Sequence, residues 1–125
     1  MKRLLMVDLD TVLTRLYTNR LAANGFQVNI PATAATALSI LRSGKPDLMV
    51  LDLGLPDVSG VQLLKNIRSE PNLAKIPVVV LTNSYGNTFG MEANLGIEKT
   101  FLKSDCNPTA LMAAIDEILH PQLGT

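Results

Sequence analysis

The chain has 125 residues, of which 47% are hydrophobic, and its 11 basic and 11 acidic side chains give a formal net charge of zero. This length predicts one domain over residues 1–125 with a proper core, and the charge balance and 4% aromatic content argue against direct binding of nucleic acid. No apolar run is long enough for a membrane span, and a single cysteine excludes an internal disulfide, so we expect a cytoplasmic protein.

The first half of the chain predicts three strands separated by two helices. A continuous apolar run at 4–7 predicts a strand buried on both faces. A helix follows, with Gly25 as its stop signal. Its apolar stripe is expected to be Val12, Leu13, Leu16, Tyr17 and Leu21. Alternating apolar and polar residues at 26–30 predict a half-exposed edge strand, a helical pattern runs from Ala34 to Gly44, and 48–51 is the next buried strand.

The second half continues the alternation. A helical pattern at 61–67 precedes a buried strand at 78–81. The stretch 85–95 is rich in glycine and turn formers, so we expect at most a short fourth helix there. A short fifth strand is expected at 100–102, and an Asn-Pro signal at 107–108 opens the last helix. The buried stripe of that helix is predicted to be Leu111, Met112, Ile115 and Leu119.

These elements form five successive βα units, which predict an α/β fold with a parallel sheet and helices on both faces. An exposed second strand beside buried first, third and fourth strands favours the flavodoxin-like order 2-1-3-4-5. In that order the site lies at the carboxyl ends of the central strands. Asp8, Asp52, Thr82 and Lys103 stand at the ends of four apolar runs.

Two carboxylates, a hydroxyl and an ammonium at one sheet edge suit phosphoryl chemistry with Mg²⁺. The metal prefers hard oxygen ligands, and a carboxylate can attack a phosphoryl group while the other groups hold its oxygens. Taken singly, Asp8 would be a helix N-cap, Thr82 a turn residue and Lys103 a solvated loop lysine. Four residues of compatible chemistry at four strand ends favour the joint site over these separate explanations.

Three segments of the chain resemble response-regulator receiver domains of two-component signalling. They are PDLMVLDLGLPDVSG at 46–60, IPVVVLTNS at 76–84 and TFLKSD at 100–105. The resemblance implies that Asp52 accepts phosphate from a histidine kinase or phosphotransfer protein. It also implies Mg²⁺ held by Asp8, Asp52 and the Gly54 carbonyl, with Thr82 on a phosphoryl oxygen and Lys103 paired with the carboxylate or phosphate.

The resemblance further implies a signalling protein rather than an enzyme with a separate substrate. Phosphate bound by Thr82 would shift the face made by the fourth helix, fifth strand and fifth helix. That face would bind a downstream protein or effector domain, and a homodimer through the same face is left open.

The chain departs from the receiver pattern at three positions. Leu9 stands where receivers carry a second acidic residue that ligates the metal, which Asp10 would replace only through water or a local change of backbone. Thr100 stands at the aromatic switch position, and Ser104 replaces the proline after the lysine, so no cis bond is implied there. These departures concern metal binding and switching, and the ground-state fold is expected to survive them.

Two other functions stay open. A degenerate receiver would act by protein contact without phosphate, as Leu9 and Thr100 suggest. The segment MVDLDTVLT at 6–14 also resembles haloacid-dehalogenase-type phosphatases, with Asp8 as nucleophile and Asp10 as general acid or base. That second alternative lacks a later acidic pair at a strand end and leaves Asp52 without a role.

Overall fold

The computed structural model describes residues 2–8, 11–53, 60–82 and 95–120. Strands and helices alternate along most of the chain, as the sequence predicts. In chain order the elements are β1 (Arg3–Val7), α1 (Thr11–Ala23), β2 (Gln27–Asn29), α2 (Ala34–Gly44), β3 (Leu48–Asp52), α3 (Gly60–Ser69), β4 (Val78–Thr82), β5 (Ile97–Leu102) and α5 (Pro108–Leu119). The fourth helix expected at 85–95 falls almost entirely outside the described residues.

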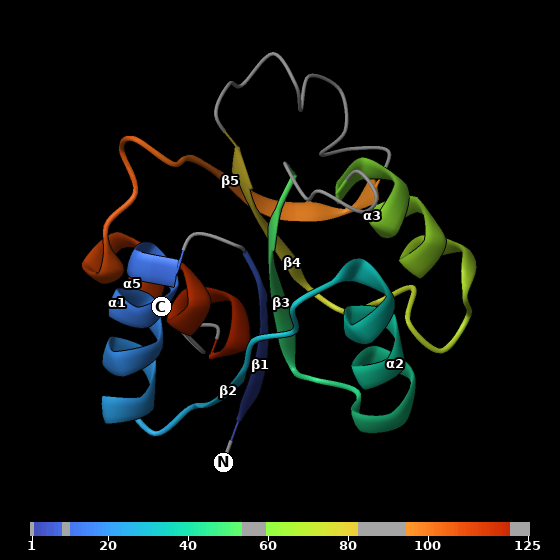
Figure 1. Cartoon of the computed structure of the whole chain (residues 1–125), viewed down its shortest axis with the longest axis horizontal. Helices are drawn as coiled ribbons and strands as arrows, with labels where there is room; N and C mark the ends of the chain where they lie inside the picture. Colours follow the sequence, from blue (N-terminus) through green and yellow to red (C-terminus); the bar gives the residue numbers. More distant parts are fainter. Residues whose placement is uncertain (1, 9–10, 54–59, 83–94, 121–125) are drawn as a thin grey trace.

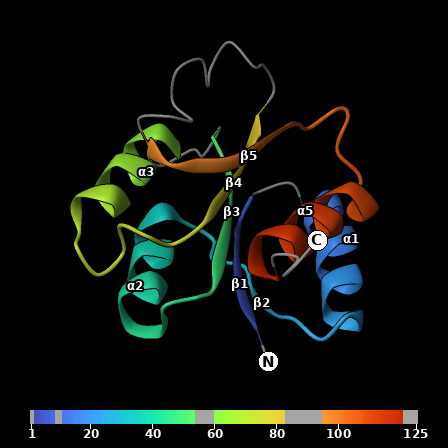
Figure 2. The same ribbon diagram turned by 180° about the vertical axis from the view of Figure 1, so that it is seen from behind.

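The strands form one parallel sheet of order β2-β1-β3-β4-β5, which confirms the predicted topology. Helices α1 and α5 cover one face of this sheet, and α2 and α3 cover the other (Figures 1 and 2). β3 and β4 are buried at every residue because they pair on both edges and are covered on both faces. Parallel pairing brings the carboxyl ends of β1, β3, β4 and β5 to one edge of the sheet.

The apolar core is divided by the sheet into two clusters. One cluster contains Leu5, Met49 and Val80 from the sheet with residues of α2 and α3. The other contains Met6 and Val50 with residues of α1 and α5. Neighbouring residues of one strand thus point to opposite clusters, which is the alternation that a strand imposes on its side chains. The two clusters hold the three central strands, β1, β3 and β4, between helical layers and so fix their carboxyl ends relative to one another.

Helix α5 begins as the sequence predicts. The Asn107 side chain accepts a hydrogen bond from the Ala110 N–H at 2.8 Å, and Pro108 occupies the first turn. Leu111 and Ile115 are its buried residues, while Met112 and Leu119 of the predicted stripe are only partly buried against the same cluster. This N-terminus follows directly on the turn that carries Lys103, so the cap also fixes where that turn ends.

The predicted apolar stripe of α1 is wrong in part. Tyr17 and Leu21 are each 1% exposed, but Val12 is 69% exposed and Leu16 is 52% exposed. Thr14 is buried in their place. The spacing of Thr14, Tyr17 and Leu21 fits a single helical face, whereas Val12 and Leu16 lie one turn apart on the outward face.

The two edge strands differ from their predicted bounds. β2 is shorter than the expected 26–30, because it pairs with only three residues of β1. β5 is longer than the expected 100–102 and begins at Ile97. Glu98 and Lys99 are exposed on this edge strand, and the register shifts where Val79 pairs with Lys99. The exposed charged residues interrupt the apolar run that would have predicted the first half of β5 from the sequence.

Candidate functional site

The four residues expected at the strand ends lie along one edge of the sheet. Asp8 directly follows β1, Asp52 ends β3, Thr82 ends β4 and Lys103 directly follows β5. Asp8, Asp52 and Thr82 are the buried polar residues of this edge, at 3%, 7% and 1% exposed. A buried polar side chain is costly unless it has a hydrogen-bond or ion-pair partner, so we expect these residues to have partners at this edge.

Lys103 joins the two carboxylates. Its Nζ donates to Asp52 Oδ2 at 3.1 Å and to Asp8 Oδ1 at 3.4 Å, and both contacts are ion pairs. The Asp8 side chain is fully buried and that of Asp52 is nearly so. One ammonium therefore serves two buried carboxylates, and the three groups together carry one negative charge when all are ionised.

The pKa of Lys103 records the balance of these forces. Partial burial is the largest single influence and by itself lowers that pKa. The hydrogen bond to Asp52 and the charges of both carboxylates together outweigh burial, so the pKa of Lys103 is raised above its ordinary value. The lysine is thus held in its cationic form against the acidic pair at neutral pH.

Thr82 is tied to the same group through the backbone. The Lys103 N–H donates to the Thr82 carbonyl at 2.8 Å, so the turn that carries the lysine is attached to the end of β4. The pairing of Asp52 with Leu81 puts Thr82 one residue beyond the partner of Asp52. All four predicted residues are thereby brought to one place, three of them in direct side-chain contact.

Gly60 allows α3 to begin directly against Asp52. A Cβ at position 60 would lie 2.5 Å from the Leu53 Cα and 2.8 Å from the Asp52 carbonyl oxygen. The Gly60 N–H donates to the Leu53 carbonyl at 3.0 Å. Glycine at this position is required by a close approach of two backbone segments.

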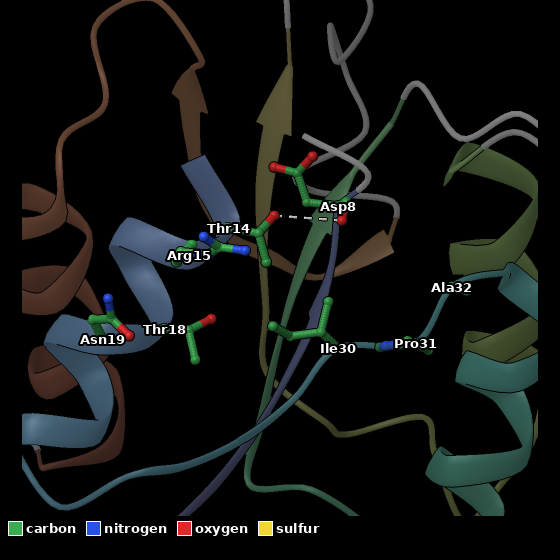
Figure 3. Close-up of a pocket in the computed structure, with 8 residues that line it drawn as sticks. All are labelled: Asp8, Thr14, Arg15, Thr18, Asn19, Ile30, Pro31 and Ala32. Atoms are coloured by element: carbon green, nitrogen blue, oxygen red, sulfur yellow. Dashed lines mark hydrogen bonds between the residues drawn. The ribbon is translucent and has the colours of Figure 1, made fainter. Parts of the chain in front are cut away.

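A cleft of about 410 Å³ lies beside Asp8, between α1 and the segment that follows β2 (Figure 3). Its walls combine polar side chains of α1, among them Thr14 and Thr18, with the apolar Ile30 and Pro31. The Thr14 hydroxyl donates to the Asp8 backbone carbonyl at 3.4 Å, shown as the dashed line in Figure 3. Sequence patterns gave no sign of Thr14 as a neighbour of the site.

The donor set of this edge is compatible with Mg²⁺. The metal is commonly bound by one or two carboxylates with waters completing its shell, and Asp8 and Asp52 supply two carboxylates. Within residues 2–8, 11–53, 60–82 and 95–120 no group of three acidic, histidine or cysteine side chains is assembled. Gly54 and Asp10, the other expected ligands, lie outside the described residues, as does Leu9.

The two remaining departures from the receiver pattern are both visible. Thr100 is half-buried on β5, and its hydroxyl meets no hydrogen-bond partner among the described residues. Ser104 is exposed and follows Lys103 directly, and the described part of the chain contains no cis peptide bond. The turn after β5 is therefore built without the proline that the receiver pattern has there.

Comparison with known proteins gives consistent results. The sequence matches the family of response regulator receiver domains over residues 4–116. It is 29% identical over 117 residues to the DNA-binding response regulator MtrA of Mycolicibacterium paratuberculosis, covering 91% of this chain and 49% of that protein. It is 28% identical over 81 residues to the polar-differentiation response regulator DivK of Brucella anthropi, covering 65% of this chain and 66% of that protein.

The fold has the same relatives. A crystal structure of a CheY-like response regulator receiver domain protein from Methanospirillum hungatei JF-1 superimposes with a TM-score of 0.84 at 29% identity, covering 95% of this chain and 94% of that one. The matched region spans about half the length of MtrA and about two thirds of that of DivK. No helix in the described ranges is both long and apolar enough to cross a membrane.

Proposed function

The chain belongs to the family of response regulator receiver domains, whose general function is phosphorylation-based signalling, and we propose that Asp52 is its phosphoryl acceptor. The observation that supports this most directly is the contact of Lys103 with both Asp8 and Asp52 at the carboxyl edge of the sheet. This edge is where ligands bind in open α/β sheets.

The chemistry follows from the groups at this edge. A carboxylate oxygen of Asp52 attacks the phosphorus of a phosphohistidine whose other ring nitrogen carries a proton. The phosphorus–nitrogen bond breaks, its electron pair stays on the ring nitrogen, and the donor histidine leaves as a neutral imidazole. The product is an acyl phosphate on Asp52. Thr82 and Lys103 supply a hydroxyl and an ammonium to the phosphoryl oxygens, whose charge they offset. The donor is a histidine kinase or a phosphotransfer protein.

Asp8 and Asp52 are the described residues that would hold Mg²⁺, and Gly54 and Asp10 remain sequence-based candidates. When bound, the ion would offset charge on the phosphoryl group and on the two carboxylates. Lys103 already contacts both carboxylates, so it would have to share them with the metal.

The output of this domain is a change in partner binding rather than turnover of a separate substrate. The partner is a downstream protein or effector domain, and the proposed contact face includes β5 and α5, with homodimerisation through that face as a further arrangement. MtrA is a DNA-binding response regulator about twice as long as the region that matches this chain, so its DNA binding is not carried over to this chain. The single cysteine supports a reducing, cytoplasmic setting.

A second candidate function is that of a degenerate receiver, which binds partners without being phosphorylated. Leu9 in place of an acidic ligand and Thr100 in place of an aromatic switch residue favour it. The acidic pair is already neutralised in part by Lys103, so such a domain would have a stable site without metal or phosphate.

Acetyl phosphate with Mg²⁺ and intact-mass detection tests the proposal. We expect one phosphate on the parent and on Asp105→Ala, which removes an exposed acid two residues from Lys103, but none on Asp52→Ala. No adduct on the parent at any Mg²⁺ concentration would favour the degenerate receiver. Release of free phosphate that depends on Asp8 but not on Asp52 would instead support the phosphatase alternative.

A further inference from the structure

We propose that Tyr17, on α1, is a positioning residue that holds Lys103 against Asp8 and Asp52. The proposal rests on the proposed function of that site, and it adds a residue from a different layer of the fold. The hydroxyl of Tyr17 donates to the turn that carries Lys103, and the proposed effect on the reacting groups acts through that turn.

Tyr17 is a buried tyrosine with a specific polar contact. Its side chain is 1% exposed within the cluster between the sheet, α1 and α5. Its hydroxyl donates to the backbone carbonyl of Cys106 at 3.3 Å. Burial raises the pKa of the Cys106 thiol, and a hydrogen bond with Tyr17 partly offsets the rise. A buried tyrosine hydroxyl needs a partner, and here the partner belongs to another element.

The turn from Lys103 to Asn107 links β5 to α5. Its own bonds are local: the N–H groups of Asp105 and Cys106 both donate to the Leu102 carbonyl at 3.0 Å. The Lys103 N–H attaches its start to Thr82, and the Asn107 cap begins α5. Ser104 provides none of the stiffness of a proline. The Tyr17 hydroxyl contacts the middle of this turn from α1.

The same helix also contacts the other side of the site. Thr14, three residues before Tyr17 and on the same buried face, donates to the Asp8 carbonyl. Helix α1 lies beside α5 in both views of the molecule (Figures 1 and 2). It is thus bonded to the residue after β1 and to the turn after β5, whose side chains Asp8 and Lys103 meet at 3.4 Å.

These contacts form a closed circuit: Asp8, Thr14, Tyr17, the Cys106 carbonyl, Lys103 and back to Asp8. A rigid helical segment spans the middle of the circuit, so the separation of Asp8 and Lys103 is set partly by α1. Removing the Tyr17 hydroxyl opens the circuit at one point while leaving the aromatic ring in the core. Lys103 would then sample positions farther from the carboxylates.

Tyr17→Phe tests this, because it removes one oxygen atom and keeps the packing. Leu21→Val is the matched control, since Leu21 is buried in the same cluster one turn along α1. We would measure the global stability of both variants, the amide hydrogen exchange of Asp105 and Cys106, and the side-chain NMR signals of Lys103 at fixed pH. Phosphorylation rates at several acetyl phosphate concentrations would be recorded alongside.

In Tyr17→Phe we expect the Asp105 and Cys106 amides to exchange roughly twofold to tenfold faster than the change in global stability accounts for, as the loss of one hydrogen bond predicts. The Lys103 signals should shift, and the maximal phosphorylation rate should fall with little change in the acetyl phosphate concentration for half-maximal rate. Leu21→Val should leave the Lys103 signals where they are. Uniform exchange and unchanged Lys103 signals in Tyr17→Phe would overturn the proposal.

The NMR and exchange measurements do not require phosphorylation. If the parent takes up no phosphate while Tyr17→Phe still shifts Lys103, the positioning role stands and the proposed acceptor function fails. If the parent is phosphorylated and Tyr17→Phe is phosphorylated at the same maximal rate, Tyr17 is a core residue only.

Discussion

At the scale of single residues, Lys103 offsets the negative charge of the two carboxylates in the site. Two ionised carboxylates that are almost completely buried repel each other and lose their hydration, and both effects destabilise the folded state. The ammonium of Lys103 contacts both carboxylates and offsets both costs. Any cation that joins the site must share the two carboxylates with Lys103 or displace it.

Gly60 is a second residue whose identity is dictated by its surroundings. Gly60→Ala would place a methyl group against the backbone of Asp52 and Leu53, and we expect a loss of about 1–3 kcal/mol in the free energy of unfolding, typical of overpacking. Urea denaturation measures it.

Gly44→Ala is the matched control for that substitution. A Cβ at position 44 would meet only the Arg3 Nη1 atom at 3.5 Å, an ordinary contact with a flexible side chain. Gly44 lies within α2, where alanine is intrinsically more favourable than glycine by up to about 1 kcal/mol. The two substitutions should therefore move stability in opposite directions, and equal effects would show that the approach at Gly60 is not tight.

The sequence predicted the four strand-end residues because each one interrupts an apolar run, and the end of a buried parallel strand is a place that can be found from pattern alone. Thr14 and Tyr17 could not be found in this way. Their contacts join residues far apart in the sequence, and both residue types are common on helix faces. Thr14 and Tyr17 are identified as neighbours of the site only by their contacts in the folded structure, which no local sequence pattern predicts.

At the scale of elements, α1 shows how a helical pattern can be misassigned. Val12 and Leu16 extend an apolar spacing that also includes Tyr17 and Leu21, so the sequence alone could not say which members are buried. A threonine took the third buried position because it bonds to the Asp8 carbonyl. Local hydrophobicity and burial disagree here because a polar contact with the site competes for the inner face.

The outward position of Leu16 gives a stability prediction. Leu16→Gln should change the free energy of unfolding by no more than about 0.5 kcal/mol, as for other surface substitutions. Leu21→Ala, a fully buried residue of the same helix, should lower it by about 2–5 kcal/mol. Comparable losses in urea denaturation would place Leu16 in the core after all.

The ion pair between α2 and the end of α3 gives a prediction of pH dependence. Arg42 on α2 donates to Glu70, just after α3, with N···O distances of 2.9–3.3 Å, and the pair is largely exposed. The hydrogen bond to Arg42 lowers the pKa of Glu70 below its ordinary value of 4.5. A depressed carboxyl pKa stabilises the fold above the unfolded-state pKa, and that contribution is lost as the pH falls through the folded-state pKa.

Arg42→Gln should therefore melt slightly below the parent at pH 7, and the difference should shrink as the pH is lowered past 4.5 and below. High salt at pH 7 should shrink it as well, because exposed pairs are screened. Melting temperatures of both proteins across pH and salt measure the effect. If the difference in melting temperature persists unchanged in acid and in high salt, it is caused by the packing of the Arg42 side chain and not by its charge.

At the scale of the whole molecule, the sheet divides the core into two clusters, and four of its five strands carry the site residues at their carboxyl ends. The charges of the chain cancel overall, so the local excess at this edge is not part of a general field. Asp8, Asp52 and Lys103 carry one net negative charge, and the sequence places Leu9 next to Asp8 where receivers have another acid. The stability of the fold should therefore respond to metal weakly, and more strongly once that acid is restored.

Leu9→Asp tests this balance through two opposite effects. Without divalent metal, another negative charge next to Asp8 in the sequence should lower stability by an amount on the order of 1 kcal/mol, because Asp8 and Asp52 already share one ammonium. With Mg²⁺, a ligand that binds only the folded state stabilises it by about 2.7 kcal/mol at one hundred times Kd. The added carboxylate should lower Kd, so Leu9→Asp should gain more from Mg²⁺ than the parent does.

Melting temperatures of the parent and of Leu9→Asp, measured in EDTA and over a Mg²⁺ titration, test this. We expect Leu9→Asp to melt below the parent in EDTA, the two melting temperatures to converge as Mg²⁺ is added, and their order then to reverse. Leu9→Asn is the control, because it adds a polar side chain of the same size without the charge. A parent that already gains as much from Mg²⁺ as Leu9→Asp would mean that Asp8, Asp52 and their neighbours suffice for metal binding. An Asp variant that is destabilised in EDTA and gains nothing from Mg²⁺ would mean that Lys103 excludes the metal.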